Sequence, residues 1–513
     1  MNPPANLILH NANIITLDES RPRATATAIR GNRIAAVGTD ADIFSQKGPK
    51  AEVINCQGKT VVPGFNDAHC HPIALAASLL AVDCGPAAVR SIADIQEAIH
   101  RRAGQTPKDC WVRATGYNEF YLAEKRHPNR RDLDTAAPEH PVKLSHRSGH
   151  ACVLNREALE LLGISAETEE PPGGMMERDL DTGEPNGLLF EMNTFVDGRI
   201  PPLTEDELET GIKLVNEAFL ANGITSLQDA TWNNSAGRWQ SLRRLKERGA
   251  LLPRVSMMTG ADALEERPSF SQGSSADNLR LGPVKIIIQA VTGSLNPPQA
   301  ELIQLVLRVH GMGLQLAFHV DEAGTLEAAL TALELALRKA PRPNHRHRLE
   351  HCSVCPPHLI KRLKETNAMV VTQPPFIYYS GERYLATVPP GDLDWLYAIG
   401  SLRAGGIRVA ASSDAPVVPF NPLVGICAAV TRTTASGQTL LLHESISAME
   451  ALQAYTIDAA YAGFEDNSKG SITPGKLADL VVLSADPTTV PPDQIREIQV
   501  LTTILDGKVV WQK

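Results

Sequence analysis

Eight short apolar segments, separated by longer amphipathic ones, follow one another through the middle of this chain. The stretches between them, such as residues 299–310 and 324–339, have helical periodicity. Eight βα units in a few hundred residues predict an α/β fold, a (β/α)8 TIM-like barrel. A doubly wound sheet is the alternative, and no Gly-x-Gly-x-x-Gly fingerprint supports it. The strand segments are the apolar run Val61-Val62 before His69 and residues 223–230, 251–259, 284–289, 314–320, 348–352, 368–373 and 407–412.

Both ends of the chain have the pattern of β-strands broken by turns. We therefore predict a small β-sandwich domain built from both termini, residues 1–63 and 466–513, with the barrel, residues 64–465, inserted between them. Residues 75 to about 215 are too long for one βα connection and contain Pro171-Pro172-Gly173-Gly174. We expect this insertion to form a cap over the barrel mouth.

Composition excludes several classes of protein. Of 513 residues, 43% are hydrophobic and 21% charged, and the net charge of −9 argues against nucleic-acid or anionic-membrane partners. The chain begins without a secretory signal pattern and has no apolar run of membrane-spanning length, which predicts a cytoplasmic protein. We expect a small-molecule substrate and a homo-oligomer, a dimer.

The eight cysteines have no spacing typical of a disulfide framework. Cys352 and Cys355 form a C-x-x-C pair, but a zinc knuckle needs a second pair and a redox motif needs a thioredoxin-like context. We interpret them as structural thiols.

Two histidines lie in the segment Pro-Gly-Phe-Asn-Asp-Ala-His-Cys-His-Pro at residues 63–72. Alternate side chains of a strand share a face, so His69 and His71 can reach one metal ion. Neutral imidazole is a good ligand for zinc and similar metals. The alternative is a pair of ordinary histidines at a strand end.

Four later strand ends carry residue types that a metal centre needs. Barrel enzymes place catalytic groups at the carboxyl ends of the strands. We predict a site for one or two divalent cations, with zinc the expected ion, and the ligands His69, His71, Lys285, His319, His351 and Asp414.

Lys285 and Asp414 have predicted roles beyond charge. Burial favours the neutral amine of Lys285, which can add carbon dioxide to form a carbamate able to bridge two metals about 3.5–4 Å apart. The alternatives are an uncarboxylated lysine paired with a carboxylate, or one that binds substrate. A bound metal lowers the pKa of water to about 7, and Asp414 could move the proton from that water to a leaving nitrogen.

The chain resembles the amidohydrolase superfamily over nearly its whole length. The resemblance implies a metal-bearing barrel, a small β-sandwich domain and hydrolysis of a C–N bond. It rests on the motif at residues 64–71, on Lys285, His319 and His351, on Ser413-Asp414-Ala415-Pro416 and on the tail at residues 470–480.

More narrowly, the chain resembles the N-substituted formamide deformylase-like branch. The matching residues include Gly149-His150-Ala151, Gly187-Leu188-Leu189-x-Glu191 and Asn421-Pro422-Leu423. Members of that branch often follow the fourth-strand lysine with Asp-Gly, where this chain has Gln289-Ala290-Val291-Thr292-Gly293. By the same resemblance His150 faces the site as a catalytic residue that polarises a carbonyl oxygen. Glu191 is a substrate-binding candidate, and the alternative for both is a structural role in the insertion.

Aromatic side chains near the ends of the second and seventh predicted strands are further substrate-binding candidates. Phe376, Tyr378 and Tyr379 could line an apolar pocket, with Trp232 added to it, or they could pack under the cap. Arg383 could bind an anionic group or pair with an acid.

These residues together predict a metal-dependent hydrolase that cleaves the C–N bond of a small amide, N-formyl or carbamate compound by metal-activated hydroxide. The alternative enzymes on the same scaffold are a deaminase and a cyclic-amide hydrolase. A catalytically silent binding scaffold is the non-enzymatic alternative, which has no need of Asp414.

Overall fold

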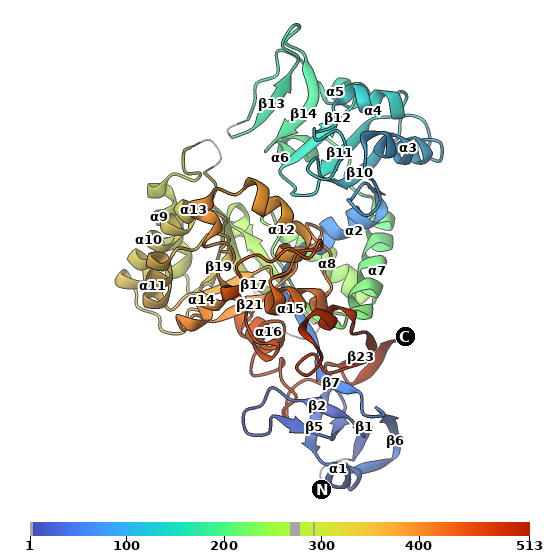
Figure 1. Cartoon of the computed structure of the whole chain (residues 1–513), viewed down its shortest axis with the longest axis vertical. Helices are drawn as coiled ribbons and strands as arrows, with labels where there is room; N and C mark the ends of the chain where they lie inside the picture. Colours follow the sequence, from blue (N-terminus) through green and yellow to red (C-terminus); the bar gives the residue numbers. More distant parts are fainter. Residues whose placement is uncertain (1–3, 172, 267–277, 291–292) are drawn as a thin grey trace. The chain divides into compact units, whose positions relative to one another are not determined.

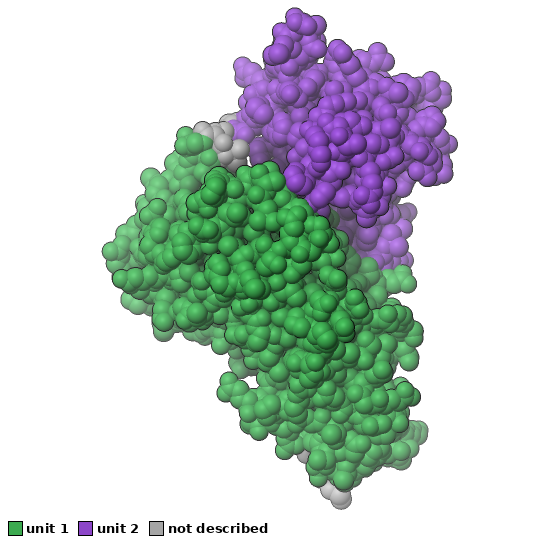
Figure 2. Space-filling model, viewed as in Figure 1, with its two compact units in different colours: residues 1–71, 216–513 green, residues 72–215 purple. Residues whose placement is uncertain are grey.

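The computed structural model describes residues 4–171, 173–266, 278–290 and 293–513. The chain divides into two compact units, residues 1–71 with 216–513, and residues 72–215 (Figure 2). The first unit holds the barrel and the strands of both termini.

Eight parallel strands form the barrel sheet, each beside its neighbour in the sequence. Backbone hydrogen bonds also link the chain at the ends of the first and last strands of this sheet. The amide of Asp414 donates to the carbonyl of His69 at 2.8 Å, and the amide of His71 donates to the carbonyl of Ala415 at 2.9 Å. The predicted (β/α)8 barrel is thus confirmed. Its strands are β8 (Phe65–Cys70), β15 (Ile224–Asp229), β16 (Arg254–Gly260), β17 (Leu279–Ile287), β18 (Leu316–Val320), β19 (Arg348–His351), β20 (Met369–Thr372) and β21 (Val409–Ala411).

The barrel strands are buried on both faces, which explains their continuous apolar runs. Helices α9 to α11 lie outside strands β17 to β19 (Figure 1). In α10 the side chains of Leu326, Leu330 and Leu333 are buried at the helical spacing that one apolar stripe requires. The helices of this unit are α1 (Asp40–Phe44), α8 (Ala236–Glu247), α9 (Gln299–Gly311), α10 (Ala323–Lys339), α11 (Pro357–Thr366), α12 (Pro375–Thr387), α13 (Pro390–Leu393), α14 (Ile399–Ala404), α15 (Pro422–Thr431), α16 (Ala448–Ala454) and α17 (Ile457–Ala462).

The terminal strands form two further sheets. One has the order β5-β4-β1-β6 and the other β24-β23-β22-β7-β2-β3, so both termini contribute to the second. Residues from both sheets share one apolar cluster, which includes Leu9, Ile29, Val61 and Leu480. The strands are β1 (Ala5–His10), β2 (Asn13–Ile15), β3 (Arg23–Ala24), β4 (Ala26–Arg30), β5 (Arg33–Gly38), β6 (Lys47–Asn55), β7 (Thr60–Pro63), β22 (Leu480–Leu483), β23 (Val500–Leu505) and β24 (Lys508–Gln512).

The apolar run Val61-Val62 belongs to β7 of this sheet and not to the first barrel strand, which is the motif itself, β8. Gly64 separates the two strands. A Cβ on Gly64 would lie 2.1 Å from Oγ1 of Thr225, so the close approach of β15 requires glycine here.

The second unit contains a six-stranded sheet of order β13-β14-β12-β11-β10-β9. Its apolar core includes Ile95, Leu133, Leu144 and Val153. Its elements are α2 (Pro72–Leu80), β9 (Val82–Asp83), α3 (Ile92–Ala103), β10 (Val112–Tyr117), α4 (Arg130–Ala136), β11 (Val142–His146), β12 (Ala151–Leu154), α5 (Arg156–Leu162), β13 (Met175–Arg178), β14 (Pro185–Phe190), α6 (Asn193–Asp197) and most of α7 (Glu205–Ala221).

Among the described helices, none combines the length and the hydropathy that a membrane crossing needs. The predicted cap position of residues 75–215 and the exact domain boundaries stay predictions.

Candidate metal centre

The motif strand β8 places one side chain on the site and another behind it. His69 and Asp67 are two residues apart and both are buried. Oδ1 and Oδ2 of Asp67 accept from the backbone amide of Ser413 at 3.1 Å and its hydroxyl at 2.5 Å, which ties the motif to the Asp414 loop. Burial raises the pKa of Asp67 to about 6, although these hydrogen bonds oppose the rise.

The first group of candidate ligands is His69, His71 and Asp414. Oδ1 of Asp414 lies 3.0 Å from Nε2 of His71 and 3.5 Å from Nε2 of His69. Burial alone would raise the pKa of Asp414, but the hydrogen bond with His71 and the charges of the neighbouring histidines lower it below its ordinary value. A carboxylate and two imidazoles therefore face one another.

The second group is His319, His351 and Asp321, whose candidate ligand atoms all lie within 4.8 Å of one another. The two groups adjoin, because the ring centroids of His69 and His351 are 4.8 Å apart and those of His351 and His319 are 4.5 Å apart. Histidines from three different strands are thus brought to one end of the barrel.

Lys285 lies on β17 beside these histidines and is 2% exposed. Burial lowers the pKa of its amine to about 8, while the charges of Glu350 and Asp414 oppose that shift. Nζ has no hydrogen-bond partner among the described residues. All six predicted ligands therefore gather in one place.

Side chains behind the histidines hold their rings by Nδ1. Glu350 contacts Nδ1 of His69 at 2.5 Å, Thr231 contacts that of His71 at 3.0 Å, and Gln373 contacts that of His351 at 2.9 Å. Arg348 in turn donates to Glu350 at 2.9 Å. Such contacts fix the tautomer and leave Nε2 for a metal.

The side chains gathered here have the chemistry of a divalent-metal site. Nε2 of His351 is buried and has no hydrogen-bond partner among the described residues, and the same holds for Nζ of Lys285. Burying polar atoms without partners is destabilising, so a cluster of them indicates that they bind something else, such as an ion. Imidazole nitrogen and carboxylate oxygen are ligands for zinc and related borderline metals.

Two site residues have left-handed backbone conformations. The φ angle of Asp414 is 59° and that of His351 is 67°. Non-glycine residues adopt this region at an energetic cost and cluster at functional sites. Both residues were predicted ligands at strand ends, where the chain must turn sharply.

His150 and Glu191 lie in the second unit and contact each other, with Nδ1 2.9 Å from Oε1. Their predicted roles at the site stay predictions. In a second pair, not predicted from the sequence, Oε2 of Glu119 lies 2.9 Å from Nε2 of His146. Burial opposes the shift, but the hydrogen bond and charge of His146 lower the pKa of Glu119 to about 2.

The predicted aromatic residues mostly pack in a cluster. Phe376 is buried against Tyr397, and Tyr378 and Tyr379 pack on the same cluster, half-buried. Their predicted contact with a substrate stays a prediction beside this packing role. Trp232, which follows β15, is 39% exposed.

Arg383 on α12 lies 4.9 Å from the ring centroid of Tyr384. Its predicted role as an anion-binding residue stays a prediction. Cys352 and Cys355 are buried free thiols, and a hydrogen bond between them together with burial raises the pKa of Cys352 well above its ordinary value. The departure from the Asp-Gly pair includes Val291 and Thr292, which lie outside the described residues.

Several supporting residues were not predicted as such. Asp67 and Glu350 carry a local signal, since each lies within two residues of a predicted ligand. Gln373 and Thr231 are remote in sequence from the histidines they hold. Asp321, two residues after His319, could have been found as a second carboxylate at the same strand end.

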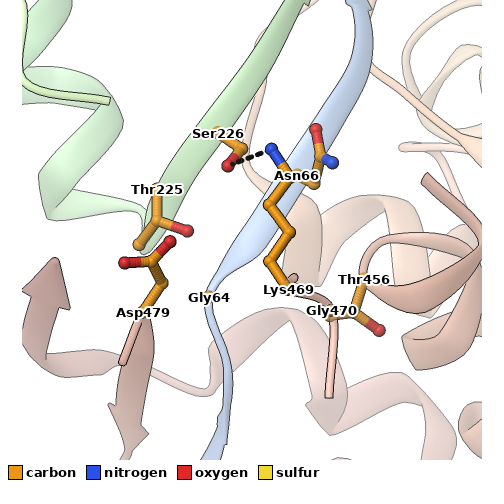
Figure 3. A pocket seen from close by; sticks show the side chains of 8 residues that line it. All are labelled: Gly64, Asn66, Thr225, Ser226, Thr456, Lys469, Gly470 and Asp479. Atoms are coloured by element: carbon orange, nitrogen blue, oxygen red, sulfur yellow. Dashed lines mark hydrogen bonds between the residues drawn. The ribbon is translucent and has the colours of Figure 1, made fainter. Parts of the chain in front are cut away.

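A separate pocket lies at the opposite, amino end of the barrel strands (Figure 3). Gly64 and Asn66 of the β8 segment and Ser226 of β15 line it, and Nζ of Lys469 donates to the hydroxyl of Ser226 at 2.9 Å. Barrel enzymes carry their catalytic residues at the carboxyl end, so this pocket is no part of the histidine site.

The barrel and its cluster of histidines, aspartates and a buried lysine define the class of metal-dependent hydrolases. Residues 52–511 match the amidohydrolase family, and the chain belongs to that family. It is 30% identical to the N-substituted formamide deformylase of Arthrobacter pascens, with 100% of this chain and 99% of the relative covered. It is 27% identical to the putative amidohydrolase YtcJ of Bacillus subtilis, with 99% of each covered. A solved structure of similar fold is an uncharacterized metal-dependent hydrolase from Pyrococcus furiosus, with TM-score 0.74, 23% identity and coverage of 94% of this chain and 100% of that one.

Proposed function

We propose that this amidohydrolase cleaves the C–N bond of a small amide, N-formyl or carbamate compound, with N-formyl amines the first class to test. The observation that carries the proposal is the position of Asp414, whose one oxygen lies 3.0 and 3.5 Å from two candidate metal-binding histidines. The substrate class is supported by the name of the Arthrobacter pascens relative, an N-substituted formamide deformylase.

His69, His71, His319, His351, Asp414 and Lys285 would hold one or two divalent cations, with zinc the proposed ion. When bound, such a cation lowers the pKa of water and polarises a carbonyl oxygen. The neutral amine of Lys285 is the form that adds carbon dioxide, and its carboxylation is part of the proposal. The cytoplasmic location, the absence of nucleic-acid and membrane partners and the dimer stay predictions.

Asp414 moves the proton. Its lowered pKa keeps the carboxylate ionised at neutral pH, so one oxygen can accept a proton from the attacking water. The same oxygen then donates that proton to the leaving nitrogen, which departs as an amine. Glu350 holds His69 by Nδ1 and keeps the ring fixed during this transfer.

The test is a substrate screen in wild type and Asp414→Asn. The protein is offered N-formyl amines, aryl amides and carbamates, and the amine and acid products are quantified alongside bound metal. We expect kcat to fall by about 10²–10⁴-fold in Asp414→Asn, because general acid–base transfer is lost. Metal content should be largely kept. Asp493→Asn, an exposed aspartate on η3 (Pro492–Glu497), is the control and should behave as wild type.

Activity that survives in Asp414→Asn would show that the proton assignment is wrong. The products separate the other enzymes on this scaffold, since released ammonia indicates a deaminase and a ring-opened acid indicates a cyclic-amide hydrolase.

A further inference from the structure

Asp321 is the second carboxylate at the carboxyl end of the barrel, and no predicted role includes it. It is the first residue after β18 and lies two residues beyond His319. Its Oδ2 lies 2.8 Å from Nε2 of His319. Its side chain is 46% exposed, so it lies on the open side of the site, unlike the fully buried Glu350.

The Asp321 carboxylate has a fixed orientation. Its Oδ1 accepts a hydrogen bond from Oγ of Ser353 at 3.1 Å. The Ser353 hydroxyl lies 3.3 Å from that of Tyr397, and both residues are buried. A side chain held from behind in this way presents its other oxygen toward the histidines at little further cost in entropy.

Which ring nitrogen an acidic side chain contacts distinguishes a candidate metal ligand from a residue that only supports the ring. Glu350, a supporting residue, contacts Nδ1 of His69, the nitrogen turned away from the site. Asp414, a candidate ligand, contacts Nε2 of His71. Asp321 contacts Nε2 of His319, as Asp414 does for His71. By this criterion Asp321 lies on the metal side of the ring.

The two groups are therefore built alike. Each combines two histidines with one aspartate from the loop after a strand, and the ligand atoms in each lie within 4.8 Å of one another. In the second group Nε2 of His351 is buried and has no hydrogen-bond partner within the described chain. Two imidazole nitrogens and one carboxylate oxygen make a three-ligand set sufficient for a catalytic zinc-type ion.

We propose that Asp321 is a ligand of a second divalent cation, together with His319 and His351, and that this ion binds whether or not Lys285 is carboxylated. The inference rests on the metal centre of the proposed function and deepens it. It makes binding of the second ion depend on Asp321 and not on a modified Lys285.

The experiment counts ions in the full-length protein. Metal is removed with a chelator, Zn²⁺ is added back by equilibrium dialysis in buffer freed of carbon dioxide, and zinc per chain is measured by mass spectrometry. We expect two zinc ions per chain in wild type and in Lys285→Ala. In Asp321→Asn and Asp321→Ala the second ion should bind about tenfold more weakly or be lost. Asp493→Asn is the control and should bind two.

Asp321 is half-exposed, so both variants are expected to fold, and thermal melting verifies this. Wild-type zinc binding in Asp321→Asn or Asp321→Ala would overturn the inference. So would loss of the second ion in Lys285→Ala alone. A wild-type chain that binds a single ion, kept in Asp321→Asn, overturns the inference but leaves the first group and the proposed function in place. A chain that binds no zinc overturns both.

Discussion

Two buried lysines lie at opposite ends of the same barrel, and their surroundings differ. At the carboxyl end, Nζ of Lys285 has no hydrogen-bond partner among the described residues. At the amino end, Nζ of Lys469 lies 2.9 Å from a carboxylate oxygen of Glu465 and donates to Ser226 at 2.9 Å. Burial lowers the pKa of both amines. One lysine is satisfied by its neighbours and the other is not.

The same contrast extends to other charged groups at the two ends. At the amino end the guanidinium of Arg254 donates to both oxygens of Asp479, at 2.7 and 3.0 Å. At the carboxyl end Nε2 of His351 has no partner in the described part of the chain. Some atoms at the amino end also lack hydrogen-bond partners among the described residues, including the amide of Asn66 and Nε of Arg280. A neutral amide costs less to bury than a charge, and Arg280 lies 3.5 Å from Glu465. Charged groups at the amino end are largely paired, whereas the carboxyl end keeps two unpartnered nitrogens, Nζ of Lys285 and Nε2 of His351, that are available for chemistry.

Replacing Lys285 should have the largest effect, and on activity. We expect Lys285→Ala to lower kcat/KM by about 10²-fold or more, since a group facing the reacting atoms is lost. If Lys285 is carboxylated, short carboxylates added to the buffer should restore part of the activity. Absence of rescue with unchanged metal content would favour the uncarboxylated amine. In the volume-matched Lys285→Met, the free energy of unfolding should not fall, because no partner is left unpaired.

Replacing Lys469 should have the opposite result. Lys469→Met leaves Glu465, whose side chain is 15% exposed, with Arg280 at 3.5 Å as its remaining ion-pair partner among the described residues. We expect the free energy of unfolding to fall by about 2 kcal/mol, because a charged hydrogen bond is lost and its acceptor stays largely buried. Urea unfolding measures this, and kcat of the folded protein should match wild type. If Lys469→Met were as stable as wild type but inactive, the division of labour between the two barrel ends would be wrong.

Most of the fold could be predicted from the sequence because its signals are local. Seven of the eight apolar runs marked barrel strands, and polar residues on or after the strands marked all six gathered side chains. The error at Val61-Val62 has a physical reason, since an apolar run buried in a sandwich reads like one buried in a barrel. Only Gly64, where β15 approaches closely, marks the boundary.

The residues behind the ligands could not be predicted in the same way. Gln373 holds His351 from the next strand, and Thr231 holds His71 across a sequence separation of 160 residues. These contacts depend on how strand ends meet in three dimensions, and a single sequence has no pattern that encodes the meeting. The aromatic residues after β20 are visible in the sequence, but their role is not, because packing and substrate binding favour the same side chains.

The smallest expected effect is a loss of folding stability at low pH, caused by two histidines at the amino end of the barrel. Nδ1 of His345 accepts the amide of His347 at 2.9 Å, and its Nε2 donates to the carbonyl of Thr366 at 2.9 Å. Nδ1 of His347 accepts the amide of Leu316 at 3.0 Å. Each ring accepts a hydrogen bond through an unprotonated Nδ1, so each is held in its neutral form. Burial lowers the pKa of both rings.

The sign of the pH effect follows from these lowered pKa values. In the unfolded chain a histidine takes up a proton near pH 6.5, whereas His345 and His347 in the folded chain do so only at lower pH. The unfolded state therefore binds more protons below pH 6.5, and the free energy of unfolding should fall as the pH is lowered from there. Urea unfolding at pH 7.5, 6.5 and 5.5 measures the slope in wild type and His345→Gln. The variant should start about 1 kcal/mol less stable at pH 7.5, having lost hydrogen bonds, and should lose less on acidification. Equal slopes in the two proteins would mean that the acid sensitivity arises elsewhere, and that the paired, neutral character assigned to the amino end does not extend to its histidines.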